Sequence, residues 1–270
     1  TFLQNTGMFL SSREAEDYLV RVGELKAVHP EPGFDGYAAG CVKGNVARAV
    51  GAPAAVSDVF LAPSGMNAIY GAFRAVSDIQ RPRGRTRWLQ LGWLYLDTIA
   101  ILREFTGRPA QDYLVQDDVF DLEALRRLFA EQGDRIAGLI TEVPTNPLIQ
   151  TPDLAAIRDL CREHGVLLVL DPTIASPLNI DVLACSDVLV NSLTKYAASE
   201  GDVIMGSVIV NPAGPHAADF RARLPGELEP VYSRDLDRLA AQIGDTADVI
   251  GRINRKSVNR VIFFPVPSSS

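Results

Sequence analysis

The sequence has few cysteines and no long apolar run. Its three cysteines, Cys41, Cys161 and Cys185, lie far apart among 270 residues, without a CxxC pair and without a histidine partner. We therefore expect neither a disulfide framework nor a metal site, and a reducing cytoplasmic location. No stretch approaches 18 apolar residues, so we expect no membrane-spanning helix, and no secretory signal pattern is present at the N-terminus.

The sequence also has fewer basic than acidic residues. The 26 Lys and Arg residues are outnumbered by 33 Asp and Glu residues, which gives a formal net charge of -7. A protein that neutralises nucleic-acid phosphates normally carries the opposite sign, so we expect no nucleic-acid partner. A doubly wound nucleotide-binding protein is disfavoured because no GxGxxG motif follows the first predicted strand. The hydrophobic share of 47% and the charged share of 22% are typical of globular soluble proteins.

From about residue 57 the chain alternates strand-like apolar runs with amphipathic helical patterns. We expect strands within 57–65, 87–93, 136–143, 166–171 and 187–192, and helices at 11–28, 66–79, 95–107, 121–132, 152–165 and 232–254. Runs such as VLLVL do not alternate apolar with polar residues, which indicates strands that are buried on both faces of the sheet. The pattern predicts an α/β fold with a mostly parallel sheet wrapped by helices.

Polar and aromatic groups follow several of these predicted strands. In a sheet of this type, ligands bind beyond the carboxyl ends of the strands. The groups that arrive there are Ser64, Gly65, Met66, Tyr95, Glu142–Asn146, Asp171 and Ser192–Lys195. We therefore expect a ligand site at this edge of the sheet.

Lys195 follows a buried strand in the run SLTKY. Partial desolvation would favour the neutral amine of Lys195, which is a nucleophile that can form a Schiff base. Alternatively, Lys195 is an ordinary lysine in a surface loop. Ser192 and Thr194 place two hydroxyl groups beside it, which suit a phosphate or a turn equally well. Asp171, at the end of VLLVLD, needs a cation or donor as a partner, and a protonated pyridine nitrogen would be one. Capping of the next element would also explain it.

Ser64, Gly65 and Met66 lie at a predicted strand-to-helix junction. The free backbone N–H groups and the helix dipole at such a junction favour a phosphate, although any α/β loop can contain Ser-Gly. Tyr95 could stack on a flat cofactor ring or belong to the core. Asn146, between two prolines in EVPTNPL, supplies an adaptable donor in a rigid turn.

Five motifs resemble the cystathionine gamma-synthase family of pyridoxal-phosphate enzymes over about residues 57–212. In chain order they are SGMNAIY, YLDT, TEVPTNPL, LVLDPTIASP and VLVNSLTKY. The run DVLVNSLTKYAASEGDVIMGSVIVNP is most similar to the fungal-type branch of that family. The resemblance implies the seven-stranded fold type I and pyridoxal 5'-phosphate as the cofactor. It also implies small amino-acid substrates and a homodimer or homotetramer with shared active sites.

The resemblance assigns a role to each motif residue. Lys195 would be the Schiff-base lysine, Asp171 the partner of the pyridine nitrogen, and Tyr95 a ring-stacking residue that assists proton transfer. Gly65 and Met66 would give backbone N–H groups to the phosphate, and Ser192 and Thr194 would add hydroxyl groups. Ser64 is expected to bind the cofactor from its place at the strand-to-helix junction. Asn146 would lie near the phenolic oxygen, Glu142 would brace its loop, and Thr173 would lie beside the ring.

The sequence departs from the family pattern in three places. GYAAGCVKG contains Tyr37 but lacks the arginine of the usual Tyr-x-Arg motif, and AASEGDV replaces a glycine-rich stretch after the lysine. The step from GRINR to KSVNRVIFFP resembles two joined pieces of a C-terminal domain, so no carboxylate-binding arginine is assigned. We expect an intersubunit arm over 1–56, a large cofactor domain over 57–215, and a linker helix with an incomplete smaller C-terminal domain over 216–270.

The resemblance implies γ-replacement on O-acyl-homoserine with cysteine to give cystathionine. A cystathionine or methionine lyase, an O-acylhomoserine sulfhydrylase and a non-catalytic cofactor-binding relative are the alternatives. The residues named above do not separate them.

Overall fold

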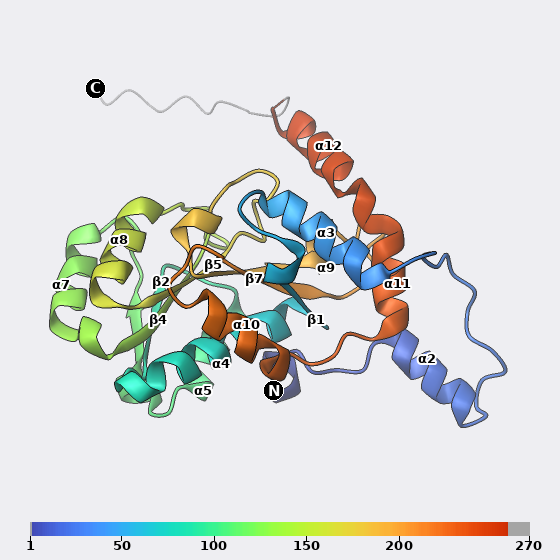
Figure 1. The fold of residues 1–270 in the computed structure, drawn as a ribbon, viewed down its shortest axis with the longest axis horizontal. Helices are drawn as coiled ribbons and strands as arrows, with labels where there is room; N and C mark the ends of the chain where they lie inside the picture. Colours follow the sequence, from blue (N-terminus) through green and yellow to red (C-terminus); the bar gives the residue numbers. More distant parts are fainter. Residues whose placement is uncertain (1, 259–270) are drawn as a thin grey trace, which may run out of the picture.

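A seven-stranded sheet forms the centre of the molecule (Figure 1). The structure is a computed structural model that describes residues 2–258. The strand order is β1-β7-β6-β5-β4-β2-β3, and only β7 runs antiparallel to its neighbours. The strands are β1 (Val59–Ala62), β2 (Arg87–Leu91), β3 (Tyr113–Gln116), β4 (Ile136–Glu142), β5 (Leu167–Asp171), β6 (Val188–Ser192) and β7 (Gly206–Val210). The predicted α/β class with a mostly parallel sheet is confirmed.

Helices cover both faces of the sheet, which is why its strands are apolar on both sides. In β5, Leu168 and Leu170 join one hydrophobic cluster, whereas Leu167 and Val169 join the other. The first cluster is completed by α3 (Ala38–Val50), α7 (Leu122–Gln132), α8 (Leu154–His164) and α11 (Ser233–Gln242). The second is completed by α4 (Gly65–Gln80), α5 (Leu96–Phe105) and α10 (Ala217–Glu227).

Short elements connect these layers or lie at their edges. The short or peripheral helices are α1 (Phe2–Thr6), α2 (Ser12–Arg21), α6 (Pro109–Asp112), α9 (Leu193–Tyr196) and α12 (Thr246–Val258). Single 3-10 turns occur at Val56–Asp58, Arg81–Arg83, Gly133–Arg135, Leu183–Cys185 and Ile243–Asp245. Among residues 2–258, no helix has the length and apolar character needed to cross a membrane.

Two predicted helices have different limits in the structure. The helix expected over 11–28 ends at Arg21, because Gly23 adopts a left-handed backbone conformation with φ of 83°. The helix expected over 232–254 is divided by the 3-10 turn Ile243–Asp245 into α11 and α12. Helix α3 and strands β3 and β7 are not among the elements expected from the sequence.

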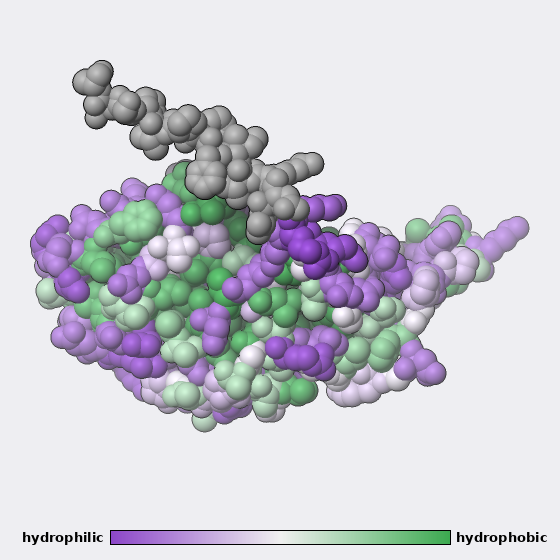
Figure 2. All heavy atoms as spheres, turned by 90° about the horizontal axis from the view of Figure 1, so that it is seen from above, coloured by the Kyte–Doolittle hydropathy of each residue, from purple (hydrophilic) through white to green (hydrophobic). Residues whose placement is uncertain are grey.

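The N-terminal residues pack on their own chain. Helix α1 contacts α4 and α5, and α3 contacts α11 and β1. Seen from above, hydrophobic side chains are spread over the middle of the molecular surface and are interrupted there by hydrophilic groups (Figure 2). The predicted division into an arm, a cofactor domain and a partial C-terminal domain stays a prediction.

Candidate cofactor site

A cavity of about 490 Å3 lies at the carboxyl ends of the parallel strands. Every site residue proposed from the sequence lines it: Ser64, Gly65, Met66, Tyr95, Glu142, Asn146, Asp171, Thr173, Ser192, Thr194 and Lys195. These residues come from four strand-to-helix connections and from α9, as expected for a fold in which loops gather at this edge. The structure therefore brings the predicted set together, while the individual roles stay predictions.

The N-terminus of α4 supplies unpaired donors to this cavity. Ser64 caps the helix: its hydroxyl accepts from the Asn67 N–H at 2.9 Å and donates to the Gly7 carbonyl at 3.1 Å. Among the described residues, the backbone N–H groups of Gly65 and Met66 have no hydrogen-bond partner. These donors and the positive end of the helix dipole form a place for an anion. Because the Ser64 hydroxyl already caps α4, it would stabilise the end of the helix that binds the phosphate rather than contact the phosphate itself.

Close packing at this point requires glycine. A Cβ atom on Gly65 would lie 2.8 Å from the Ser192 Cβ, and one on Gly206 would lie 2.3 Å from the Ser64 carbonyl oxygen. The start of α4 therefore approaches the end of β6 and the start of β7 more closely than a side chain would allow. This approach brings the free N–H groups next to the Ser192 hydroxyl.

Two carboxyl groups stand side by side at the base of the cavity. Glu142 ends β4 and Asp171 ends β5, and the two residues are paired in the parallel register. Burial, together with the charge of Asp171, raises the pKa of Glu142 to about 8. Burial raises the pKa of Asp171 to about 6, although a hydrogen bond from the Thr173 N–H at 2.9 Å opposes the shift. Within residues 2–258, neither carboxyl group has an ion-pair partner.

Glu142 joins the end of β4 to a neighbouring loop, while its predicted role in bracing the loop of Asn146 stays a prediction. Its Oε1 accepts a hydrogen bond from the Tyr95 backbone N–H at 2.5 Å. It thereby ties the β2–α5 connection to the end of β4. The Tyr95 side chain is 46% exposed, which leaves ring surface available for stacking. Burial and the nearby Asp97 raise the pKa of the Tyr95 hydroxyl.

Hydroxyl groups cross-link the loops around the cavity. The Thr173 hydroxyl accepts from the Ser192 N–H at 2.9 Å and donates to Asn191 Oδ1 at 3.3 Å. The Thr194 hydroxyl bonds to both backbone groups of Met205, at 3.1 and 3.2 Å. Among the described residues, the Ser192 hydroxyl makes no hydrogen bond. Ser192 is therefore the hydroxyl most available to a phosphate, whereas Thr194 holds the loop that follows Lys195.

Lys195 differs from the expectation of partial desolvation. It lines the cavity from the single-turn helix α9, but its side chain is exposed in this chain. The cause is its position on a short turn that projects beyond the end of β6 into an open cavity. Its neighbour Tyr196 is anchored by a hydrogen bond from its hydroxyl to the Ile174 carbonyl at 3.0 Å. This bond attaches α9 to the loop that follows Asp171.

The cavity also has an apolar wall that is not among the features expected from the sequence. This wall consists of Phe9, Ile69, Ile174, Tyr196 and Ile204. Tyr196 and Ile204 belong to runs that the sequence analysis quoted, and Ile174 follows Thr173 directly, so position after a strand could have indicated them. No local pattern places Phe9 at the cavity, because it comes from the distant N-terminal segment.

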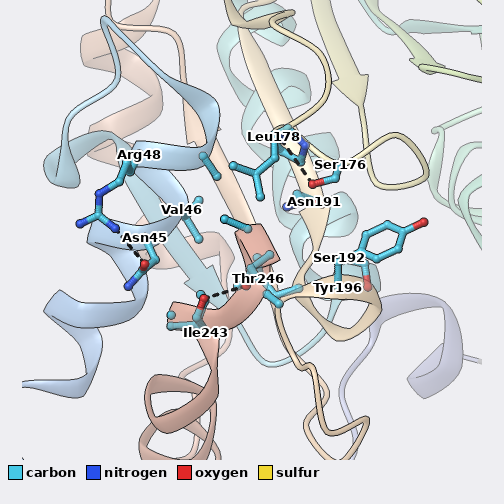
Figure 3. Close-up of a pocket in the computed structure, with 16 residues that line it drawn as sticks. Asn45, Val46, Arg48, Ser176, Leu178, Asn191, Ser192, Tyr196, Ile243 and Thr246 are labelled. Atoms are coloured by element: carbon cyan, nitrogen blue, oxygen red, sulfur yellow. Dashed lines mark hydrogen bonds between the residues drawn. The ribbon is translucent and has the colours of Figure 1, made fainter. Parts of the chain in front are cut away.

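A second cavity of about 120 Å3 lies on the other side of α9 (Figure 3). It shares Ser192 and Tyr196 with the first, and α3 contributes Asn45 and Arg48 to its wall. Its lining is mainly apolar and includes no carboxyl group. Across the part of the chain that the structure describes, no cluster of His, Cys, Asp and Glu could hold a metal ion. The titratable groups of the first cavity make it the candidate chemical site.

The first cavity fits pyridoxal phosphate at both ends of the cofactor. The unpaired N–H groups of Gly65 and Met66 suit the phosphate. At the other end, the carboxyl group of Asp171 lacks a counter-charge, which a protonated ring nitrogen would supply. Lys195 provides the amine that the aldehyde requires. This sheet with this donor set is typical of pyridoxal-phosphate-dependent enzymes of fold type I.

Comparison with known proteins agrees with this class. The model of the family described as "Cys/Met metabolism PLP-dependent enzyme" matches residues 42–228, and the chain belongs to this family. Pyridoxal phosphate is therefore its cofactor. The resemblance inferred from the motifs is confirmed, since a cystathionine gamma-synthase of Neurospora crassa is 35% identical and aligns with 75% of this chain and 32% of that protein.

Two further similarities extend this result. The L-2-amino-4-chloropent-4-enoate dechlorinase/desaturase of Streptantibioticus cattleyicolor is 42% identical, over 99% of this chain and 55% of that protein. A solved methionine gamma lyase from Micromonospora echinospora is 25% identical with a TM-score of 0.57, over 75% of this chain and 51% of that one. The chain thus spans about half the length, or less, of the relatives it matches.

Proposed function

We propose that this chain forms the cofactor-binding part of an enzyme that removes a substituent from the γ-carbon of an amino acid. The observation that carries the proposal is the placement of Lys195 and Asp171. Asp171 ends β5 and Lys195 follows the neighbouring strand β6, and both line one cavity together with the unpaired N–H groups of α4. This arrangement offers an amine, a carboxylate and an anion site to one flat cofactor.

Each residue has a defined task in this proposal. When bound, pyridoxal phosphate withdraws electrons from the α-carbon, which makes loss of the α-proton feasible. The N-terminus of α4 and the Ser192 hydroxyl bind the phosphate. Asp171 keeps a proton on the ring nitrogen, Tyr95 packs on the ring face, and the Lys195 amine takes the α-proton of the substrate. Glu142 and Thr173 hold the surrounding loops through the hydrogen bonds described above.

Within this reaction class we propose γ-replacement on an O-acyl-homoserine, with cysteine as the nucleophile and cystathionine as the product. The run DVLVNSLTKYAASEGDVIMGSVIVNP supports this reaction through its similarity to the fungal-type synthases. A sulfhydrylase would differ only in using sulfide. The cavity residues named above serve either nucleophile.

Elimination without an incoming nucleophile is the second candidate. The relative that is 42% identical over nearly the whole chain is a dechlorinase/desaturase, and its name places chlorine on the γ-carbon of an amino acid. Loss of chloride and loss of an acyloxy group both require a leaving group on the same carbon. The same lysine, carboxylate and anion site serve both reactions.

The experiment has a covalent and a catalytic part. After incubation with pyridoxal phosphate and borohydride reduction, peptide mass analysis should locate the cofactor on Lys195, and Lys195→Ala should lose it while the exposed control Lys26→Ala keeps it. Assays with O-acetyl-homoserine, O-succinyl-homoserine and a γ-chloro amino acid, with and without cysteine, then separate replacement from elimination. Retention of reduced cofactor by Lys195→Ala would refute the lysine assignment. A wild-type protein that binds the cofactor but converts none of these amino acids would instead be a non-catalytic relative.

Two further properties stay proposals. A homodimer or homotetramer with shared active sites is proposed from the resemblance, and sedimentation of the cofactor-loaded protein would test it. A cytoplasmic location is proposed from the scarcity and wide spacing of the cysteines.

A further inference from the structure

Residues 2–9, here called the N-terminal strap, pack against the first turn of α4. The strap begins with α1, where the Asn5 side chain donates a hydrogen bond to Glu104 of α5 at 3.2 Å. Its Gly7 carbonyl accepts from the Ser64 hydroxyl at 3.1 Å. The strap ends at Phe9, which lines the cofactor cavity. It therefore runs from α5 to the cavity wall by way of the helix end that is proposed to bind the phosphate.

Asn67 joins the strap to α4. It is the third residue of the helix and is only 1% exposed. Its side-chain Nδ2 donates to the Thr6 carbonyl at 3.0 Å, and its Oδ1 accepts from the Glu229 N–H at 3.1 Å. A buried amide is costly to leave without partners, so these two bonds fix the side chain in this position. Asn67 thus connects the strap and the segment after α10 to one turn of α4.

Gly7 is the point of closest approach between the strap and the helix. It adopts a left-handed backbone conformation with φ of 66°. A Cβ atom on Gly7 would lie 2.1 Å from the Ser64 Oγ and 2.5 Å from the Asn67 backbone nitrogen. Glycine is therefore required here for both the backbone conformation and the space. The strap lies directly against the turn that contains Gly65 and Met66.

The first turn of a helix is easily disordered, because its N–H groups have no partners within the helix. Such groups bind an anion most tightly when they are already held in place, since no free energy is then lost in ordering them. In α4 the Ser64 hydroxyl caps the turn by accepting from the Asn67 N–H at 2.9 Å. The strap supports the same turn from its side. Support of this kind would preorganise the N–H groups of Gly65 and Met66.

We propose that Asn67 is a positioning residue for the cofactor. By joining the N-terminal strap to α4, it keeps the backbone N–H groups of Gly65 and Met66 in place for the cofactor phosphate. In the described part of the chain, Asn67 is not among the residues that line the cavity, so it acts through the helix end and not by contact. The inference rests on the phosphate site proposed above. Because phosphate binding and strap docking favour the same arrangement, each should stabilise the other.

Equilibrium dialysis of the full chain with pyridoxal phosphate and with pyridoxal tests the proposal, because the two ligands differ only in the phosphate. We expect Asn67→Ala to weaken binding of pyridoxal phosphate at least about tenfold and binding of pyridoxal less than about twofold, because only the phosphate uses the first turn of α4. Gly7→Ala displaces the strap without changing a residue of α4. It should have the same selective effect.

Two matched controls separate positioning from loss of stability. Asn211→Ala removes another buried asparagine, 2% exposed, whose Nδ2 donates to the carbonyls of Leu183 and Ser186. It follows β7 at the edge of the sheet opposite the cavity, so it should lower stability and leave the ratio of the two affinities unchanged. Gly23→Ala introduces the same left-handed strain as Gly7→Ala, but its Cβ would meet nothing within 4 Å. It should bind both ligands like wild type.

Hydrogen exchange of the wild-type protein tests the same coupling without a variant. Exchange in residues 2–10 should slow when pyridoxal phosphate is added, and it should slow less when pyridoxal is added at equal occupancy. This measurement decides the question if the variants do not fold.

Several results would overturn the role of Asn67. These are equal losses of both affinities in Asn67→Ala, wild-type affinities in both strap variants, an altered affinity ratio in Asn211→Ala, and equal exchange in residues 2–10 with either ligand. A wild-type protein that binds pyridoxal as tightly as pyridoxal phosphate would instead refute the phosphate site at α4. None of these measurements involves turnover, so they do not depend on the reaction proposed above.

Discussion

Glu142 and Asp171 end neighbouring parallel strands in register, so two carboxyl groups meet at one edge of the sheet, and within residues 2–258 neither forms an ion pair. Such a pair is costly while both groups are ionised, since burial and mutual repulsion favour the protonated forms. In the proposed enzyme the cofactor ring nitrogen neutralises Asp171. Glu142 instead accepts a hydrogen bond from the backbone N–H of Tyr95. The two carboxyl groups therefore have separate tasks although they have similar surroundings.

The first prediction concerns the pH dependence of stability without cofactor. The pKa of Glu142 is raised from 4.5 to about 8, so the native state holds its proton more tightly than the unfolded chain. The free energy of unfolding should therefore fall as the pH rises from about 4.5 to about 8, by at most about 1.4 kcal/mol per pH unit from this group. Glu142→Gln removes this component, so the stability of the variant relative to wild type should rise with pH. Urea unfolding at several pH values measures the difference.

Glu163→Gln is the matched control, since Glu163 is exposed on α8. Its stability relative to wild type should change little across the same pH range. A constant difference between Glu142→Gln and wild type from pH 5 to pH 8 (about the window set by the shift) would contradict the raised pKa of Glu142.

The sequence allowed much of this site to be predicted because its signals are local. VLLVLD ends in a carboxylate and VLVNSLTK ends in an amine, and parallel strands bring such ends to one edge. The seven-stranded fold and the cofactor followed from the motif resemblance, and both are confirmed. All predicted cofactor residues line one cavity for the same reason.

Features that depend on distant contacts could not be predicted in this way. No local pattern shows that β7 runs antiparallel between β1 and β6. Helix α3 follows a segment rich in proline and glycine, and its packing against α11 involves residues far away in the chain. The exposure of Lys195 depends on how far α9 projects from the sheet, and the occupied hydroxyl of Thr194 depends on Met205. These properties require the folded chain.

The second prediction concerns the close approach of α4 to β6. Gly65→Ala would place a methyl group 2.8 Å from the Ser192 Cβ, at the entrance to the unpaired N–H groups. We expect affinity for pyridoxal phosphate to fall at least tenfold, with little loss of overall helical structure. Equilibrium dialysis of the cofactor measures the affinity, and circular dichroism monitors the fold.

Gly44→Ala in α3 is a suitable control because a Cβ atom there would meet nothing within 4 Å. It should bind the cofactor like wild type and stabilise the protein by up to about 1 kcal/mol, since alanine favours helix more than glycine does. Wild-type cofactor affinity in Gly65→Ala would argue against phosphate binding at the start of α4.

The third prediction concerns Arg13, a buried residue of α2 whose contacts join three distant segments. Its guanidinium binds Glu31 at 2.8 Å, Asp235 of α11 at 3.1 Å, and both the carboxylate and the carbonyl of Asp202 at 3.0 and 2.9 Å. Asp202 lies in the loop between Lys195 and β7. Arg13 therefore connects the N-terminal segment to the loop that follows Lys195.

Removing this cation would leave partly buried carboxylates without a counter-charge. We expect Arg13→Ala to lower the free energy of unfolding by about 3 kcal/mol, and Arg13→Lys to recover only part of it, because an ammonium cannot form the planar set of contacts. Urea denaturation measures both values. Arg21→Ala, an exposed position on the same helix, should change stability by less than about 0.5 kcal/mol. Equal stabilities of Arg13→Ala and Arg21→Ala would show that the network contributes nothing to the fold.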